Sequence, residues 1–224
     1  MNAQPVISVR GEAQLEVEPE IALMEVTIQA RDRDRQLVLS RLASRNQHVT
    51  GLIKGHGEAV EKLESGPVTV RPDVRERRAG ERVAGYAGFA SMRVTLRDFT
   101  ILGELVASLA EEDLVTVAGP WWALRGDSPA YRDARLAAAR DAQLRASEYA
   151  QAFGCAVGAL IEAADVGLLT TPGEGGRHYE AAMAYDRGKS VVARASVGGM
   201  EFELARQTVT AQVEARFAMT LAAG

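Results

Sequence analysis

The sequence predicts an α/β (α+β) protein made of two ββα-type units, ββαββ followed by αβαββ, with largely antiparallel sheets packed by two long helices. Three observations predict this fold. Several segments alternate apolar and polar residues, two long segments repeat their apolar residues with a helical period, and polar or glycine-rich stretches separate them. The 224 residues, 47% of them hydrophobic, can bury a large core, which excludes a disordered chain.

The first two strands are predicted near the start of the chain. Residues 7–17 are rich in β-branched side chains and end at Glu18-Pro19, and residues 22–30 alternate apolar and polar side chains. A short proline-containing turn lies between these segments. We therefore expect them to form an antiparallel hairpin with one buried face.

A long helix is predicted from Asp34 to about Gly55, where the spacing of the apolar residues changes. One helical face carries Val38, Leu42, Val49 and Ile53. Residues 62–70 and 83–96 return to strand composition, and the polar residues 71–82 are predicted to connect them. These elements form the first unit, residues 1–97.

The second unit, residues 98–224, is predicted to begin with a short helix at about 99–111 and a strand at 115–124. A second long helix follows, from about Ser128 to Phe153, with Ser128 as its N-cap candidate. Its many alanines predict a helix that packs closely on a sheet.

Two further strands are predicted, at residues 159–166 and 208–221, and the last one alternates strictly between apolar and polar side chains. Between them, residues 168–199 have no sustained period and contain many glycines. A connection of this length within a compact domain is either functional or flexible, and we expect a flexible segment.

Composition excludes several classes of protein. The formal net charge of −4 offers no global attraction to nucleic acid or to an anionic membrane surface. The single cysteine, Cys155, excludes an intramolecular disulfide and a thiolate metal cluster. We expect no membrane span, since no segment approaches roughly 20 apolar residues. Because the chain as given begins without a signal peptide, we expect it in the cytoplasm.

The candidate functional residues are aromatic and basic rather than catalytic. Trp121 and Trp122 are adjacent in a predicted strand, so they face opposite sides of the sheet. One could lie in the core while the other meets a partner, and burial of both is an equal alternative. The basic residues of the 71–82 connection are the second candidate, with Arg75, Arg77 and Arg78 as interface residues. Its carboxylates and its lack of aromatic residues favour a solvated tip over a nucleic-acid site.

No catalytic set, metal site or cofactor is predicted. Cys155 follows the end of a long helix, whose dipole raises a thiol pKa, so a structural thiol is expected. His48 and His56 are two helical turns apart, too far to share one metal ion. His178 lies in the glycine-rich segment beside Glu180, with no fixed partner predicted for either.

The order of several short motifs resembles the SIMPL domain family over residues 7–221. The motifs are Ile7–Ala13, Val17–Ala22, Gly85–Tyr86, Ala152–Gly154, Ile161–Glu162 and Thr208–Val213. The resemblance implies a single SIMPL-like domain spanning residues 1–224, with two ββα-type units. It also implies assembly into multimers, ring-like or channel-like in bacterial envelope members. Some members are linked to stress protection and one animal member to binding a signalling kinase. The family has no recognised catalytic motif to carry over.

We therefore expect a non-enzymatic, self-associating scaffold or protein-interaction protein that forms a homo-oligomer, with another protein as an alternative partner. The alternative is a small-molecule-binding protein or hydrolase in which residues 168–199 form a lid over a cleft. In that alternative, His178 and Glu180 are the acid/base candidates.

Overall fold

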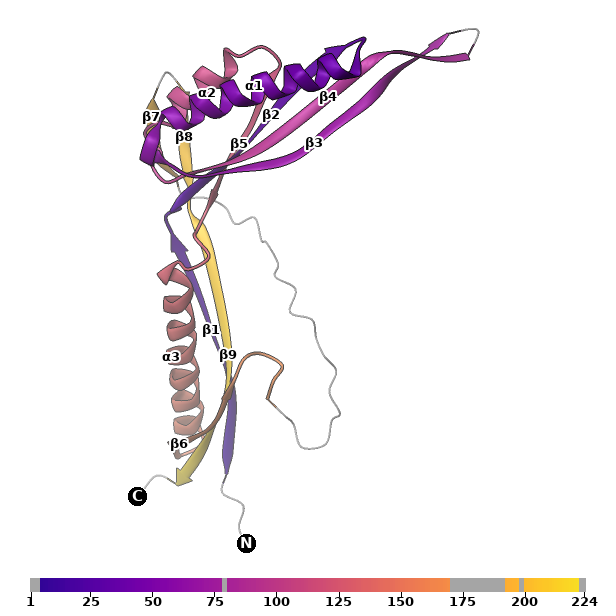
Figure 1. Cartoon of the computed structure of the whole chain (residues 1–224). Helices are drawn as coiled ribbons and strands as arrows, with labels where there is room; N and C mark the ends of the chain where they lie inside the picture. The colour runs from indigo at the N-terminus through magenta and orange to yellow at the C-terminus, as the bar shows by residue number, and fades with distance from the viewer. Residues whose placement is uncertain (1–4, 78–79, 170–191, 198–199, 222–224) are drawn as a thin grey trace. The chain divides into compact units, whose positions relative to one another are not determined.

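The computed structural model describes residues 5–77, 80–169, 192–197 and 200–221, and the chain divides into two compact units (Figure 1). Both are mixed α/β structures with antiparallel sheets, as the sequence predicts. Unit 1 is formed by residues 1–17, 126–189 and 207–224, and unit 2 by residues 18–125 and 190–206. The sequence predicts a single boundary between residues 97 and 98. The structure instead builds unit 1 from three separate segments, because the first strand pairs with the last one.

Unit 2 is built on a four-stranded sheet in the order β3-β4-β2-β5. Its strands are β2 (Ile21–Asp32), β3 (Val60–Arg77), β4 (Gly80–Leu96) and β5 (Val115–Ala123). Helices α1 (Arg35–Gly55) and α2 (Leu102–Ala110) cover one face, and a short 3-10 turn, η1 (Gly57–Ala59), follows α1 (Figure 1).

The core of unit 2 lies between this sheet and the two helices. Even-numbered residues of β2 and β4 are opposite one another and face the helices, since Ala22 is paired with Leu96 and Ile28 with Ala90. The predicted buried face of α1 is confirmed, and Asp34 caps that helix by accepting the Gln36 N–H at 2.7 Å.

Gly88 lets α1 lie close to the sheet of unit 2. A Cβ atom at this position would be 2.5 Å from Val38 Cγ1 and 2.6 Å from Leu42 Cδ1, both on α1. The side chain of any other residue would displace the helix or its side chains.

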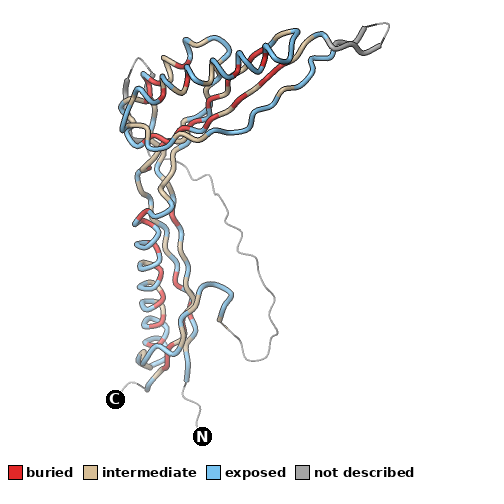
Figure 2. The backbone as a smooth tube through the Cα atoms, in the orientation of Figure 1, coloured by how far each residue is buried: buried red, intermediate tan, exposed pale blue. Residues whose placement is uncertain are grey.

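Unit 1 has a three-stranded sheet in the order β1-β9-β6, with β1 at Val6–Val17, β6 at Cys155–Ala164 and β9 at Gln207–Leu221. Helix α3 (Pro129–Ala152) packs on one face of it. Figure 2 shows the buried positions of α3 along its strand-facing side. They are all alanines, four residues apart: Ala130, Ala134, Ala138, Ala142, Ala146 and Ala150.

The alanine face of α3 and the glycine opposite it bring helix and strand close together. A Cβ atom at Gly11 in β1 would lie 2.0 Å from the Ala138 carbonyl oxygen and 2.5 Å from the Ala142 nitrogen. The predicted N-cap is also confirmed, because Ser128 Oγ accepts the Ala130 N–H at 3.3 Å.

The predicted hairpin of residues 7–30 is wrong. β1 pairs with β9, from Val6 opposite Ala218 to Val17 opposite Gln207, whereas β2 pairs with β4 and β5. Alternation specifies which face of a strand is buried and leaves its partner open.

The predicted polar connection at residues 71–82 is also wrong over most of its length. β3 and β4 continue their pairing to Arg77 opposite Gly80. Charged side chains on exposed strand faces leave the backbone free to form the ladder, so polarity alone does not end a strand.

Part of the predicted flexible segment 168–199 is a strand. β7 (Val192–Val197) pairs with β8 (Met200–Ala205), and Phe202 of β8 packs against the core of unit 2. These strands add to the predicted αβαββ order, and residues 170–191 lie outside the described residues. In the part of the chain that the structure describes, none of the helices is long and apolar enough to cross a membrane.

Candidate interaction surfaces

Trp121 and Trp122 lie on opposite faces of β5, the outer strand next to β2. Trp122 is opposite Ala22 on the helix-covered face, where its ring meets that of Phe99 edge-on, with centroids 5.0 Å apart at 70°. Trp121 is opposite Leu23 on the face without helices and is 51% exposed. The structure therefore packs Trp122, partly buried, against the core and leaves Trp121 at the surface.

A bulge before the tryptophans sets this arrangement. The pairing of β2 with β5 shifts register between Leu23 and Glu25, and Gly119 lies in the extra stretch with φ of +111°. A Cβ atom at Gly119 would lie 2.8 Å from the Leu23 carbonyl oxygen, so the conformation and the space both favour glycine. The sequence Gly119-Pro120 thereby directs Trp121 outward.

Among the residues that the structure describes, α1 and α2 lie on one face of the four-stranded sheet of unit 2, and the other face, which we call the open face, has no helix on it. It carries the odd-numbered residues of β2 and β4, including Glu25 opposite Arg93 and Arg31 opposite Ala87. Trp121 and Leu23 lie at one end of this face. The open face therefore carries an exposed tryptophan at one end and charged side chains along its strands.

Unit 1 also exposes large apolar side chains, which sequence analysis missed. Phe153 is 72% exposed at the end of α3, and Leu144 and Tyr149 are exposed on the same helix. On β6, Leu160 and Ile161 are exposed as well. These residues are large apolar positions outside the alanine stripe of α3 or on an outer strand, and that pattern could have identified them.

The outer strand β1 has part of its edge occupied. The Glu12 backbone N–H donates to the Asp141 carboxylate of α3 at 2.9 Å, and Arg145 contacts the same carboxylate at 2.8 Å. The backbone groups at an exposed strand edge can pair with another chain. The contact with Asp141 occupies one of these groups on β1, the Glu12 N–H.

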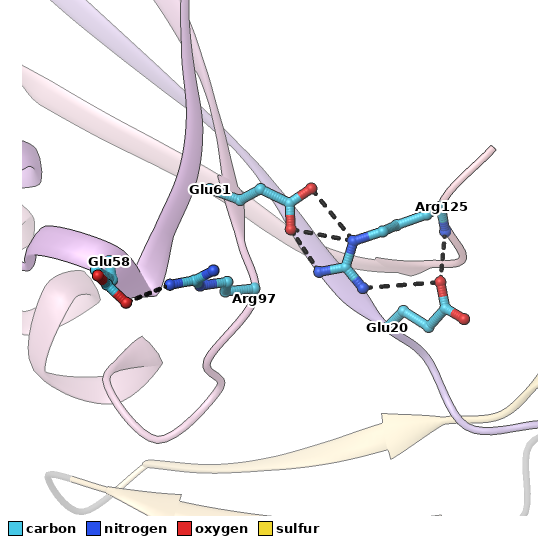
Figure 3. A network of polar contacts seen from close by, with 5 residues as sticks. All are labelled: Glu20, Glu58, Glu61, Arg97 and Arg125. Carbon is cyan, nitrogen blue, oxygen red and sulfur yellow. Dashed lines mark hydrogen bonds and ion pairs between the residues drawn. The ribbon is translucent and has the colours of Figure 1, made fainter. Parts of the chain in front are cut away.

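Arg125 joins two carboxylates of unit 2 (Figure 3). Its guanidinium binds Glu61 of β3, with Nε donating to Oε2 at 3.1 Å and Nη2 contacting the same oxygen. Its backbone N–H donates to Glu20 at 3.0 Å. The hydrogen bond from Arg125 holds the pKa of Glu61 below its usual value, against an opposing effect of partial burial. Beside this cluster, Arg97 pairs with Glu58 at 2.7 Å.

The basic interface candidates are only partly described. Arg75 and Arg77 belong to β3, whereas Arg78 lies outside the described residues. The side chains of Arg75 and Arg77 also lie outside the description, as do His178 and Glu180. The interface role of the three arginines stays a prediction.

The remaining sequence candidates are separate from one another. His48 contacts Glu112 at 3.0 Å, and His56 caps the end of α1. Cys155 is half-buried at the start of β6, where its thiol contacts the Phe153 carbonyl oxygen at 3.7 Å. Among the described residues, His, Cys, Asp and Glu side chains form no group of three or more that could hold a metal ion.

A family model described as "SIMPL: Protein of unknown function (DUF541)" matches residues 7–217. The match covers most of both units and confirms the family that the sequence motifs resemble. A comparison with curated proteins found no significant match.

Proposed function

This chain belongs to the SIMPL family, and we propose that it is a non-enzymatic, self-associating scaffold or protein-interaction protein. Trp121 carries this proposal. Its indole is half exposed on the open face of unit 2, whereas Trp122, the next residue, packs against Phe99. Tryptophan is enriched at the centres of protein interfaces, where it contributes large contact area with little loss of side-chain freedom.

Covering Trp121 in an interface would contribute substantially to the free energy of association. A tryptophan buries roughly 200 Å² when fully covered, so covering the exposed half corresponds to about 2 to 3 kcal/mol of apolar burial. Two symmetry-related copies would each contribute this amount in a twofold interface.

The apolar residues of unit 1 support association independently. The core of unit 1 is small, because α3 contributes alanines to it while Phe153, Leu144 and Tyr149 remain exposed. A surface of this kind favours contact with another protein chain. The outer strands β1, β3, β5 and β6 add sheet edges that a second chain could extend.

The arrangement of charges supports a structural role. Glu61 is held by Arg125, Glu214 by Arg10 at 2.8 Å, and Glu162 by Arg216 at 3.2 Å. Carboxylates paired in this way serve as acceptors in ion pairs, and the lowered pKa of Glu61 is opposite to what a general acid at neutral pH requires.

Sedimentation velocity at micromolar concentration tests the proposal. We expect a mass above that of the 24.0 kDa chain, and we expect Trp121→Ala to shift it toward the monomer while unfolding stays cooperative. Trp122→Ala is the matched control: it should destabilise unit 2 by about 3 to 5 kcal/mol, because it leaves a cavity beside Phe99. A monomer mass for the unmodified chain at every concentration would exclude self-association.

A further inference from the structure

The open face of unit 2 contains a hollow of about 340 Å³ between strands β2, β3 and β4. Its lining residues are Arg31, Arg71, Pro72, Asp73, Ala87 and Phe89. Ala87 is buried and forms the floor, because it lies between Arg31 on one neighbouring strand and Arg71 on the other. With strands about 4.8 Å apart, two arginines then flank a floor one small residue wide.

The two arginines are held in different ways. The Arg71 guanidinium lies over the ring of Phe89, with its central carbon 4.9 Å from the ring centroid. The backbone of Arg31 is fixed from the other face of the sheet, because Arg41 of α1 donates to its carbonyl oxygen at 3.0 Å. The Arg71 guanidinium and the Arg31 backbone are therefore each held by a contact within unit 2.

The charge around the hollow is only partly balanced. Asp32, the carboxylate next to Arg31 in sequence, pairs with Arg41 at 2.9 Å and also accepts the Asp34 N–H. Among the residues that the structure describes, neither Arg31 nor Arg71 has a carboxylate within 4.0 Å. Two guanidiniums and the carboxylate of Asp73 give the lining a net charge of +1.

We propose that this hollow binds a small organic acid. Its carboxylate is held between the guanidiniums of Arg31 and Arg71, which present paired N–H donors of the right geometry. Its apolar body lies on Ala87 and against the ring of Phe89. A net charge of +1 matches a monoanion, and Asp73 disfavours a highly charged anion such as a polyphosphate.

Benzoate is a suitable probe, followed by the amide resonances of residues 31, 71, 87 and 89 in a heteronuclear NMR titration of the full chain. We expect saturable shifts at these residues, with a Kd on the order of millimolar because the site is open to solvent. Benzamide has the same shape without the charge, and phosphate has the charge without the apolar body. We expect each to bind at least about tenfold more weakly than benzoate.

Arg31→Gln and Arg71→Gln should each weaken benzoate binding by about fivefold or more, and Arg31→Lys should retain part of it. Arg93→Gln is the matched control, since Arg93 lies on the same open face between Glu25 and Glu64, outside the hollow. It should leave the Kd unchanged. Sedimentation velocity on the same samples reports the oligomeric state. A change in the benzoate Kd without a change in mass is therefore an effect on this site and not on self-association.

Three results would overturn the proposal. The first is the absence of saturation at about 20 mM benzoate. The second is equal weakening by Arg93→Gln and Arg31→Gln, which would mean that general surface charge attracts the anion. The third is benzamide or phosphate binding as tightly as benzoate, since a carboxylate on an apolar body would then not be what the hollow selects.

Discussion

The backbone N–H of Arg125 donates a hydrogen bond to the side-chain carboxylate of Glu20 at 3.0 Å. Glu20 follows the point where the chain enters unit 2, and Arg125 is the last residue before it leaves for α3. The Arg125 guanidinium then reaches Glu61 on β3 (Figure 3). One arginine thus fastens three separate segments of unit 2.

Removing the Arg125 side chain should destabilise unit 2 modestly. Arg125→Met leaves the carboxylates of Glu20 and Glu61 without their shared cation, but about a third of the Arg125 and Glu61 side chains is exposed to solvent. We expect a loss of roughly 0.5 to 1 kcal/mol in the free energy of unfolding by urea. Arg97→Met, which breaks a pair with the highly exposed Glu58, should cost less. Equal losses would argue against a special role for Arg125.

The same contact predicts a pH dependence. The hydrogen bond from Arg125 lowers the pKa of Glu61 from 4.5, so the folded state binds this proton less readily than the unfolded state. Its contribution is complete above the unfolded pKa and declines as the pH falls through the lower folded value. Urea unfolding at a series of pH values from neutral to acidic should show this loss. Arg125→Met should reduce the slope, and an unchanged slope would contradict the assignment.

Close packing of α3 on β1 makes Ala138 sensitive to size. Ala138 is fully buried and its backbone lies against Gly11, so Ala138→Leu should cost about 1 to 3 kcal/mol. Arg140 lies on the exposed side of α3, and Arg140→Ala should change stability by less than about 0.5 kcal/mol. Thermal unfolding of the two variants compares them directly. Equal melting temperatures would mean that the helix face has been assigned wrongly.

Two glycines of unit 2 should respond oppositely to alanine. At Gly88 the added methyl group would collide with Val38 and Leu42, and a loss of about 1 to 3 kcal/mol is expected. At Gly51, within α1, the methyl group meets nothing within 4 Å. Gly51→Ala should therefore stabilise the helix by about 0.5 to 1 kcal/mol. Chemical denaturation measures both, and stabilisation by Gly88→Ala would contradict the close approach of α1.

Local patterns in the sequence were sufficient to predict both long helices and most strands, but they missed β7 and β8 and the outer parts of β3 and β4. The buried face of α1, the alanine face of α3 and the Ser128 cap depend on residues within a few turns of one another, and each is confirmed. Partner choice depends on residues far apart in sequence. The pairing of β1 with β9 could not be predicted, because alternation in each strand is compatible with several partners.

The tryptophan surface was also predictable only in its local part. Strand geometry placed Trp121 and Trp122 on opposite faces, and the structure agrees. Which of them is exposed depends on the face that α1 and α2 cover and on the bulge at Gly119. The hollow at Arg31 and Arg71 was also hidden in the sequence, since β2 and β3 bring these residues together only through β4.

The pairing of β1 with β9 also constrains how the protein folds. Arg10 and Glu214, which form an ion pair across these strands, are 204 positions apart in the chain. During synthesis, β1 emerges from the ribosome early and must wait for β9, while most of unit 2 is already available to fold. Closing so long a loop is slow, so unit 1 forms last. Until then β1 has no partner strand, and its unpaired backbone can aggregate or bind a chaperone.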